Sequence, residues 1–329
     1  MKVVINGFGR IGRQFFQAAL EQNLPVEFII NGISNPENAA YLLKYDSVYG
    51  KSKLSVHVSK GDLVIGKHKI KVLNERDPKK FPWKKLKVDL VIESTGKFRS
   101  KELAMAHVNA GAKRVLITAT AKNVDALIVP GINSKTLKKE HKVISMASCT
   151  TNCVTPMFKI VDDVFGIKEG FMVTAHSYTS SQRLVDGTHK DFRRGRSAAN
   201  NIVPTSTSAA DAAAKVLPHL KGKLDGYALR VPVVDGSVVD LSIEVKKKPT
   251  VDKINNAFKK FSNGKLKGIV EYSKEPLVST DILRNSHSCI FDSLLTKVRG
   301  NLINIVGWYD NEWGYSSRLV DIVRIIKKL

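Results

Sequence analysis

Hydrophobic and polar residues follow two different patterns along the chain, and the pattern changes near residue 148. In the first part, short apolar runs alternate with segments whose apolar residues recur every three or four positions, which predicts strands alternating with helices. Residues 54–73 differ, because their period-two alternation predicts an antiparallel meander. A further helix should open at Asn35, an N-cap residue followed by proline. The predicted strands are 3–6, 26–31, 89–93, 114–118 and 143–146, and the predicted helices are 10–21 and 101–110.

Long strands dominate the second part, after a helix predicted at 154–165. Ser208 and Asp211 have the spacing of a capping box at the start of one helix. Repeating strand–helix units in the first part predict an α/β doubly wound, mostly parallel sheet, whereas consecutive strands here favour antiparallel pairing and an α+β fold. The predicted strands are 170–178, 227–234, 237–247 and 302–310, and the predicted helices are 209–217, 251–261 and 311–328.

The 329-residue chain is strongly basic, with 53 lysines and arginines against 30 acidic residues and a formal net charge of +23. Such a surface attracts anionic substrates and polyanions. The lysine clusters are scattered, however, and they lack interleaved aromatic residues and any nucleic-acid-binding motif. A generally cationic surface is therefore favoured, with RNA or another polyanion kept as an alternative, secondary partner.

The remaining composition is that of a soluble globular protein, and no apolar run reaches the length of a membrane helix. Because the sequence enters a strand directly after Met1, we expect no leader peptide. Three cysteines form an odd, sparse set without a metal-ligand pattern, as is usual in a reducing compartment. We expect a cytoplasmic protein without a metal site.

Cys149 lies where a predicted strand gives way to a predicted helix, with Ser148 as the N-cap. Unpaired N–H groups and the helix dipole favour a thiolate there, so the thiol should ionise easily and act as a nucleophile. A lone cysteine is more often a buried apolar group, and Cys153, one turn later, is expected to be structural.

The motif GFGRIG at 7–12 follows the first strand and opens the first helix. In that context Gly7, Gly9 and Gly12 predict a dinucleotide site, with the pyrophosphate at the helix N-terminus and Arg10 beside it. The second strand should then end in an acidic residue that holds the adenosine ribose. Gly32 stands at that position instead.

His176 ends a predicted strand in the second part, and its imidazole can serve as the base that a nucleophilic cysteine needs. Arginines at 193, 194 and 196, the hydroxyl run 205–208 and Arg230 supply the groups of a phosphate site. Each of these groups alone is typical of an exposed surface or of a helix cap. Together with Cys149 they indicate a phosphorylated substrate.

These motifs identify a resemblance over the whole chain to phosphorylating glyceraldehyde-3-phosphate dehydrogenase. The matching segments are INGFGRIGR at 5–13, LLKYDSVYG at 42–50, ESTGKF at 93–98, SCTTNC at 148–153, AHSYT at 175–179, RRGRSAANNIVPTSTSAA at 193–210 and WYDNEWGYSSR at 308–318. The resemblance implies a Rossmann-type domain at 1–148, a catalytic domain at 149–310 and a helix at 311–329 that returns to the first domain.

The resemblance also implies a reaction. Cys149 attacks the aldehyde of glyceraldehyde 3-phosphate, and His176 takes protons while hydride passes to NAD(P). Inorganic phosphate then releases 1,3-bisphosphoglycerate from the thioester. A homotetramer is implied, with residues 180–201 as the intersubunit loop.

Further site residues follow from matched positions in the family. One anion site would use Thr179 and Arg230, and the other would use Ser148, Thr150, Arg194 and Thr207. Asn311 would hold the nicotinamide amide and Tyr315 would pack against its ring. The remaining cofactor contacts would be Arg10, Ile11, Arg76, Thr95, Gly96 and Thr118.

Some positions depart from the family. Ser208 replaces a usual glycine at an anion site, Ser180-Ser181 replaces a pair with a carboxylate, and Thr120 replaces a common proline. The nearest rival is erythrose-4-phosphate dehydrogenase, which hydrolyses its thioester, but the Ser-Tyr-Thr after His176 looks more like the phosphorylating enzyme.

The cofactor is the most open point. Gly32 removes the carboxylate that repels the 2′-phosphate of NADP. Ser34 and Asn35 could donate to that phosphate, and Thr188, which stands where NAD-specific relatives commonly have proline, could reach it from a neighbouring subunit. We expect both NAD and NADP to be accepted.

Overall fold

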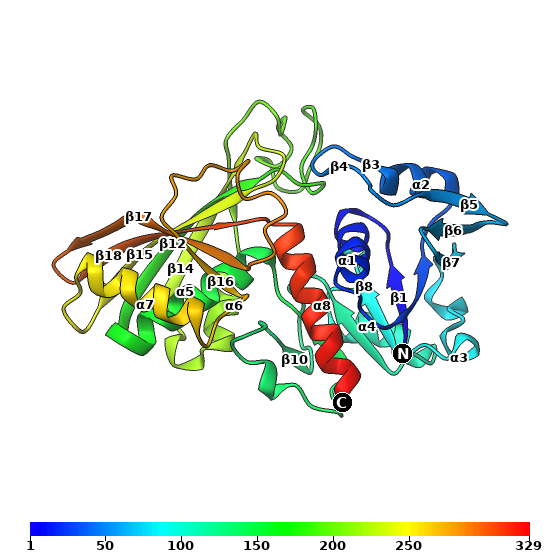
Figure 1. Cartoon of the computed structure of the whole chain (residues 1–329), viewed down its shortest axis with the longest axis horizontal. Helices are drawn as coiled ribbons and strands as arrows, with labels where there is room; N and C mark the ends of the chain where they lie inside the picture. The colour runs from blue at the N-terminus through cyan, green and yellow to red at the C-terminus, as the bar shows by residue number, and fades with distance from the viewer. The chain divides into compact units, whose positions relative to one another are not determined.

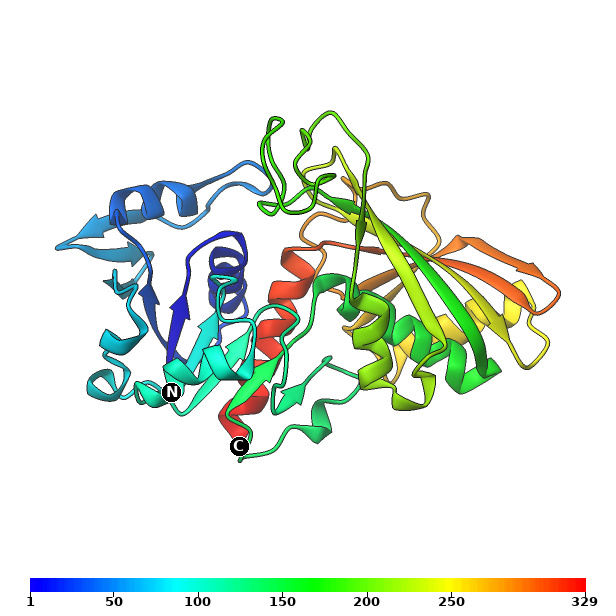
Figure 2. The same ribbon diagram turned by 180° about the vertical axis from the view of Figure 1, so that it is seen from behind.

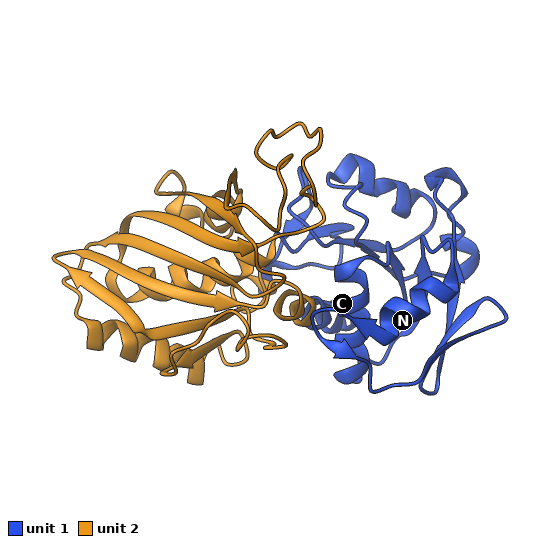
Figure 3. Ribbon diagram, turned by 90° about the horizontal axis from the view of Figure 1, so that it is seen from above, with its two compact units in different colours: residues 1–128, 135–147, 319–329 blue, residues 129–134, 148–318 orange.

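A nine-stranded sheet organises the first of two units in the computed structural model, which describes residues 1–329. This unit comprises residues 1–128, 135–147 and 319–329 and is blue in Figure 3. The strands pair in parallel from β10 to β7, and β6 and β5 then continue antiparallel. Their order is β10 (Ala126–Leu127), β11 (Val143–Ser145), β9 (Arg114–Ile117), β8 (Leu90–Glu93), β1 (Lys2–Asn6), β2 (Glu27–Asn31), β7 (His68–Leu73), β6 (Asp62–Ile65) and β5 (Val56–Ser59).

The central strands of this sheet are apolar because both of their faces are covered. In β1 and β8, all residues from Val3 to Asn6 and from Leu90 to Glu93 are buried. A separate two-stranded sheet joins β3 (Tyr45–Asp46) to β4 (Gly50–Lys51). The helices, labelled in Figure 1, are α1 (Arg10–Glu21), α2 (Pro36–Lys44), α3 (Trp83–Leu86) and α4 (Lys101–Asn109).

A seven-stranded sheet forms the second unit, residues 129–134 and 148–318. Most neighbours pair antiparallel, but β12 with β14 and β16 with β17 are parallel. The order is β13 (Val203–Ser206), β14 (Leu224–Val231), β12 (Ile167–Ser177), β15 (Ser237–Val245), β18 (Leu302–Tyr309), β17 (Cys289–Arg299) and β16 (Val270–Ser273).

Helices α5 (Cys149–Phe165), α6 (Ala209–Val216) and α7 (Val251–Asn263) pack against this sheet, and Figure 2 shows them from behind. In β15 alternate residues, among them Leu241 and Ile243, are fully buried in one core with Met157 and Val161 of α5. Fully burying an aliphatic side chain of this size contributes about 1.5–3 kcal/mol. This core therefore holds α5 against the sheet.

Helix α8 (Trp313–Lys328) begins in the second unit, and its residues from Leu319 belong to the first. Within the first unit, Arg324 donates to the carbonyl and side-chain oxygens of Gln22, and Lys327 donates to the Pro25 carbonyl. No helix of the chain has the length and apolar character needed to cross a membrane.

The predicted fold class is confirmed, and most predicted elements lie within a few residues of their observed bounds. The N-caps Asn35 and Ser148 accept from Asn38 N–H and Thr151 N–H. The capping box at Ser208 was wrong, because the Ser208 side chain caps nothing and Thr207 Oγ1 accepts from Ala209 N–H instead. Strands β13, β16 and β17 were not predicted.

Candidate active site

Cys149 is the first residue of α5, directly after a sharp turn. Ala147 has a φ of 54°, in the left-handed region, so the chain reverses there before the helix begins. Ser148 accepts from Thr151 N–H at 3.0 Å and fixes the first turn. The predicted strand-to-helix position of Cys149 is therefore present.

His176 faces Cys149 from the end of β12, with 3.3 Å between its Nε2 and Sγ. Its Nδ1 lies 2.8 Å from the Ser177 carbonyl, which can only accept. The Arg230 Nη1, which can only donate, lies 2.7 Å from the same nitrogen and competes with that carbonyl for it. With the ring proton on Nδ1 directed at the carbonyl, the Nε2 lone pair faces the thiol. This is the tautomer of a base that can take the Sγ proton.

Arg230 stands beside His176 because β12 and β14 pair in parallel with these two residues in register. Its Nη1 lies 2.7 Å from His176 Nδ1 and donates to the Ser177 carbonyl at 3.0 Å. Its buried Nε has no hydrogen-bond partner in the protein. A buried, unpaired guanidinium N–H is costly and suits an anionic ligand.

Electrostatics keep the pair neutral in this geometry. Burial, followed by the charges of Arg230 and Arg194, lowers the pKa of His176 to about 3. Burial raises the pKa of Cys149 to about 11, although Arg230 and the Thr150 N–H and hydroxyl act in the opposite direction. Loss of hydration thus opposes the easy ionisation that the sequence predicts for this thiol, although Cys149 keeps part of its surface exposed at the start of α5. Nucleophilicity must then come from proton transfer to His176.

The remaining predicted anion-site residues occupy several places. Arg194 donates to Thr205 Oγ1 at 2.7 Å and lies 3.5 Å from Asp191. The Thr179 hydroxyl is 2.9 Å from that of Ser181. Arg230 contacts His176 directly, whereas Thr179, Arg194, Thr207 and Ser208 make no hydrogen bond to Cys149 or His176.

Tyr309 is a buried residue that sequence reasoning missed. Its hydroxyl hydrogen-bonds with Thr150 Oγ1 and Thr174 Oγ1, both at 2.9 Å, and its ring meets His176 edge-on at 5.9 Å. It thereby ties the first turn of α5 to β12. Its sequence signal was weak: a tyrosine at the end of a mostly apolar strand, within the matching segment 308–318.

Asn311 is held by two serines that were also missed. Ser177 Oγ and Ser237 Oγ both donate to Asn311 Oδ1, at 2.8 and 2.6 Å. Ser237 Oγ in turn accepts from Ser177 N–H. With Oδ1 doubly engaged, the orientation of the Asn311 amide is fixed. Tyr315, the other predicted nicotinamide contact, is buried in the first turns of α8.

The glycines of the glycine-rich turn in the first unit have two different roles. Gly7 has a φ of 93°, and a Cβ on Gly12 would lie 2.3 Å from the Gly7 carbonyl oxygen, so both are needed for the turn itself. A Cβ on Gly9 would meet nothing within 4 Å. Gly9 therefore leaves the start of α1 open, as a pyrophosphate at a helix N-terminus requires. The turn fits a dinucleotide.

The other predicted cofactor residues follow the carboxyl ends of parallel strands, where such ligands bind. Arg10 pairs with buried Asp46 at 2.6 Å, which leaves its guanidinium anchored. Ile11 lies in the first turn of α1. Gly32 and Ser34 follow β2, Arg76 follows β7, Thr95 and Gly96 follow β8, and Thr118 follows β9. Thr188 lies in the second unit, exposed in the 180–201 loop.

Family models match both parts of the chain: "Glyceraldehyde 3-phosphate dehydrogenase, NAD binding domain" at residues 1–101, and the C-terminal domain of the same family at 148–311. A Mycobacterium avium protein named glyceraldehyde-3-phosphate dehydrogenase is 51% identical over 335 residues, covering 100% of this chain and 99% of that protein. Glyceraldehyde-3-phosphate dehydrogenase 2 of Bacillus subtilis is 47% identical, covering 98% and 96%. The chain belongs to the glyceraldehyde-3-phosphate dehydrogenase family and is an NAD-dependent oxidoreductase.

Proposed function

We propose that this chain catalyses the reversible phosphorylating oxidation of glyceraldehyde 3-phosphate to 1,3-bisphosphoglycerate, with Cys149 as nucleophile and His176 as base. The observation that carries the proposal is the 3.3 Å contact between Sγ and His176 Nε2, which can take the thiol proton when the ring proton is on Nδ1. Family membership supplies the substrate class and NAD.

The first step is addition of the thiol to the aldehyde. Sγ bonds to the carbonyl carbon while Nε2 takes the Sγ proton and delivers it to the former carbonyl oxygen. A neutral imidazole is restored, and it then accepts the hydroxyl proton as the carbon becomes a thioester. Bound NAD⁺ supplies the acceptor for the hydride of that carbon.

The second step is phosphorolysis. An oxygen of inorganic phosphate attacks the thioester carbon, the C–S bond breaks, and the acyl phosphate leaves. The leaving sulfur takes up a proton through Nε2, and the one remaining proton, from the thiol or from hydrogen phosphate, passes to solvent. Cys149 and His176 thereby return to their starting state. The covalent route thus divides oxidation and acyl transfer between two easier steps.

Two cationic groups would hold the substrate phosphates. Arg230, with Thr179, would bind one, and its unpaired buried Nε supports that role. Arg194, with Ser148, Thr150, Thr207 and Ser208, would bind the other. Asn311, oriented by Ser177 and Ser237, keeps its two amide hydrogens available for a carboxamide oxygen.

Acceptance of NADP is a finer proposal, based on Gly32. Space for a side chain exists there, since a Cβ would meet only Gly7 at 3.6 Å or more, but no carboxylate is present. Asn35 uses its Oδ1 as the cap of α2, which leaves its amide nitrogen free to donate. The nearby Glu37 in the first turn of α2 acts against a phosphate, so we expect dual use rather than a strong NADP preference.

A homotetramer with subunit contacts through residues 180–201 completes the proposal. Leu184, Val185 and Phe192 in this loop are 77%, 72% and 89% exposed, which is unusual for large apolar side chains. Three free thiols without a disulfide support a reducing, cytoplasmic location. Light scattering on a size-exclusion column measures the assembly directly.

The relatives described above carry the name of the phosphorylating enzyme, which supports neither the erythrose-4-phosphate alternative nor a polyanion-binding role. Omission of phosphate provides the decisive test. Without it, glyceraldehyde 3-phosphate and NAD⁺ should give a burst of one NADH per active site and then stop, because the thioester persists. Sustained turnover without phosphate would show a hydrolytic enzyme.

A further inference from the structure

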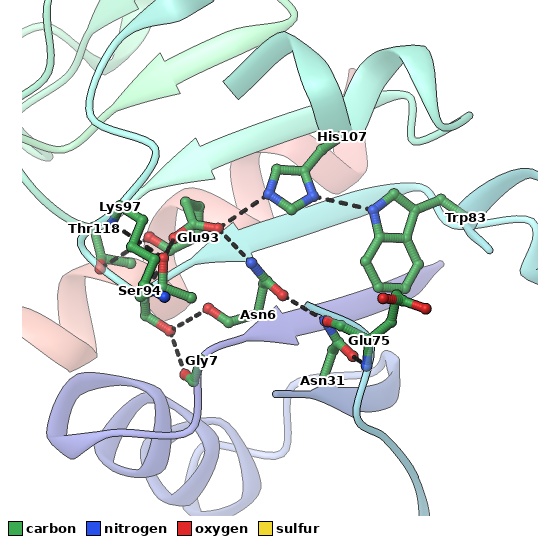
Figure 4. Close-up of polar contacts among 11 residues, drawn as sticks. Asn6, Gly7, Asn31, Glu75, Trp83, Glu93, Ser94, Lys97, His107 and Thr118 are labelled. Atoms are coloured by element: carbon green, nitrogen blue, oxygen red, sulfur yellow. Dashed lines mark hydrogen bonds and ion pairs between the residues drawn. The ribbon is translucent and has the colours of Figure 1, made fainter. Parts of the chain in front are cut away.

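Five buried polar side chains form a continuous hydrogen-bonded row in the first unit, drawn in Figure 4. Asn31, Asn6 and Glu93 are the last residues of the adjacent strands β2, β1 and β8, and they are register partners. His107 of α4 and Trp83 of α3 extend the row. None of the five is more than 3% exposed. We refer to them as the Glu93 row.

Both ends of the Glu93 row are unambiguous donors, which fixes every orientation between them. The Trp83 indole N–H donates to His107 Nδ1 at 3.0 Å, so the His107 proton is on Nε2, 3.0 Å from Glu93 Oε2. At the other end, Glu75 N–H donates to Asn31 Oδ1. The Asn31 amide must then donate to Asn6 Oδ1 at 2.7 Å, and Asn6 Nδ2 to Glu93 Oε2 at 2.6 Å.

The row therefore converges on a carboxylate. Glu93 Oε1 accepts from the Thr95 N–H at 2.9 Å and from the Thr95 hydroxyl. With four donors directed at two oxygens, Glu93 is ionised. His107 is neutral, and no lysine or arginine pairs with Glu93. A buried anion without a cation is costly, so its stability depends on these charge-assisted hydrogen bonds.

The chain leaves the three strands of the row into the turns proposed to hold the cofactor. Asn6 precedes Gly7, Asn31 precedes Gly32, and Glu93 precedes the turn at 94–96. Two of these turns are in close contact, because a Cβ on Gly7 would lie 2.8 Å from the backbone nitrogen of Thr95. Ser94 Oγ also donates to the Gly7 carbonyl at 2.6 Å.

We propose that Glu93 is a positioning residue for dinucleotide binding, whose buried carboxylate holds the glycine-rich turn and the Thr95 turn in one fixed arrangement through the Glu93 row. The inference rests on the proposed cofactor contacts at these turns. A negative charge near a pyrophosphate site opposes binding by itself. Any benefit of Glu93 to binding must therefore come from its positioning of the two turns. Removing the charge alone would strengthen NAD⁺ binding, whereas losing the positioning would weaken it.

Glu93→Gln separates these roles. The new NH₂ group must face either the His107 and Asn6 donors, where no acceptor exists, or the Thr95 turn, where the hydroxyl can turn to accept but the Thr95 N–H loses its acceptor. Asn6 and His107 cannot reorient, since their other atoms are committed to Asn31 and Trp83. Among the groups that contact Glu93, the Thr95 turn is the one most easily displaced, and we expect it to loosen.

Direct titration of NAD⁺ by calorimetry is the primary measurement, with KM for NAD⁺ and kcat alongside. We expect the Kd and KM for NAD⁺ to rise about tenfold or more in E93Q, as for a lost hydrogen bond to a charged group. The iodoacetamide labelling rate of Cys149 and the KM for the aldehyde should not change. Glu102→Gln, on the exposed face of α4, is the matched control.

The outcomes separate the two hypotheses. If the wild-type protein does not bind NAD⁺, the proposed function fails. If it binds and E93Q binds equally well or more tightly, the positioning role is refuted. A purely structural role would lower the melting temperature and the folded fraction without raising the Kd of the folded protein.

His107 provides a second pair of variants should E93Q fold poorly. His107→Gln can accept from Trp83 and donate to Glu93, whereas His107→Leu can do neither. We expect the Kd for NAD⁺ to stay near that of the wild type in H107Q and to rise several-fold in H107L. Equal Kd values in both would contradict transmission through the row.

Discussion

Two buried histidines show how one side chain acquires different roles in the two units. His107 is stacked on Phe81 at 4.8 Å, and His176 meets Tyr309 edge-on. Each imidazole is neutral and has a nearby group at both nitrogens. They differ in what Nε2 faces: the Glu93 carboxylate for His107, and the Cys149 thiol for His176.

That difference decides the chemistry. A carboxylate can only accept, so it fixes the proton on His107 Nε2 and removes that nitrogen as a base. A thiol can donate, so His176 keeps an available lone pair. The surroundings of the two histidines differ in the same way. The side chains of the Glu93 row hydrogen-bond to one another, whereas Arg230 Nε is buried without a hydrogen-bond partner. Saturated hydrogen bonding stabilises the framework around His107, whereas the unpartnered Arg230 Nε beside His176 can take a ligand.

Cys149→Ser gives the largest expected effect. An alcohol is a far weaker nucleophile than a thiol with a base beside it, so kcat should fall by roughly three orders of magnitude or more. Steady-state NADH formation measures the loss, and the Kd for NAD⁺ serves as the control. Substantial residual turnover would remove Cys149 from the chemistry.

His176→Asn tests the comparison itself. Loss of a general base should lower kcat by roughly 10²–10⁴-fold, while H107Q leaves kcat unchanged. The same rate assay on both proteins is sufficient. If the two substitutions lowered kcat equally, the distinction between a base and a structural imidazole would collapse.

Arg230→Ala should raise the KM for the aldehyde far more than that for NAD⁺. A charge-assisted contact to phosphate is worth about 1.5–3 kcal/mol, so kcat/KM should fall by roughly one to two orders of magnitude. The substitution also removes the charge beside His176, so the pH profile should be recorded. An unchanged KM for the aldehyde argues against the phosphate contact.

Gly32→Asp and Gly32→Asn form a matched pair for cofactor choice. Both put a side chain where φ is 91°, so strain is shared and only the charge differs. We expect kcat/KM for NADP⁺ to be lower in G32D than in G32N by about one to two orders of magnitude, with a small difference for NAD⁺. Equal NADP⁺ values would show that this position does not sense the 2′-phosphate.

The pH dependence of alkylation tests the ionisation state of Cys149 without any substitution. With the pKa of Cys149 raised to about 11 by burial, the thiolate fraction is small and grows with pH. The iodoacetamide rate at Cys149 should therefore rise about tenfold per unit from about pH 6 to about pH 9. A plateau beginning near neutral pH would instead indicate a preformed thiolate.

Local chemistry explains what the sequence could predict. Ser148 as a cap, Cys149 at a helix start and the glycine-rich turn depend on neighbours within a few residues, and all were found. The pairing of His176 with Arg230 depends on the register of β12 with β14, 54 residues apart, which no local pattern encodes. Glu93 likewise looked like an ordinary polar end to an apolar strand. The effect of burial on the ionisation of Cys149 also requires the folded chain.

Trapping the covalent intermediate tests the central claim most directly. The protein is mixed with glyceraldehyde 3-phosphate and NAD⁺ without inorganic phosphate, quenched in acid and mapped by peptide mass spectrometry. The account predicts a 3-phosphoglyceroyl group on the peptide that contains Cys149, and its loss when phosphate is added before the quench. An acyl group on Cys153 or Cys289, or NADH formation with no acylated peptide, would contradict it.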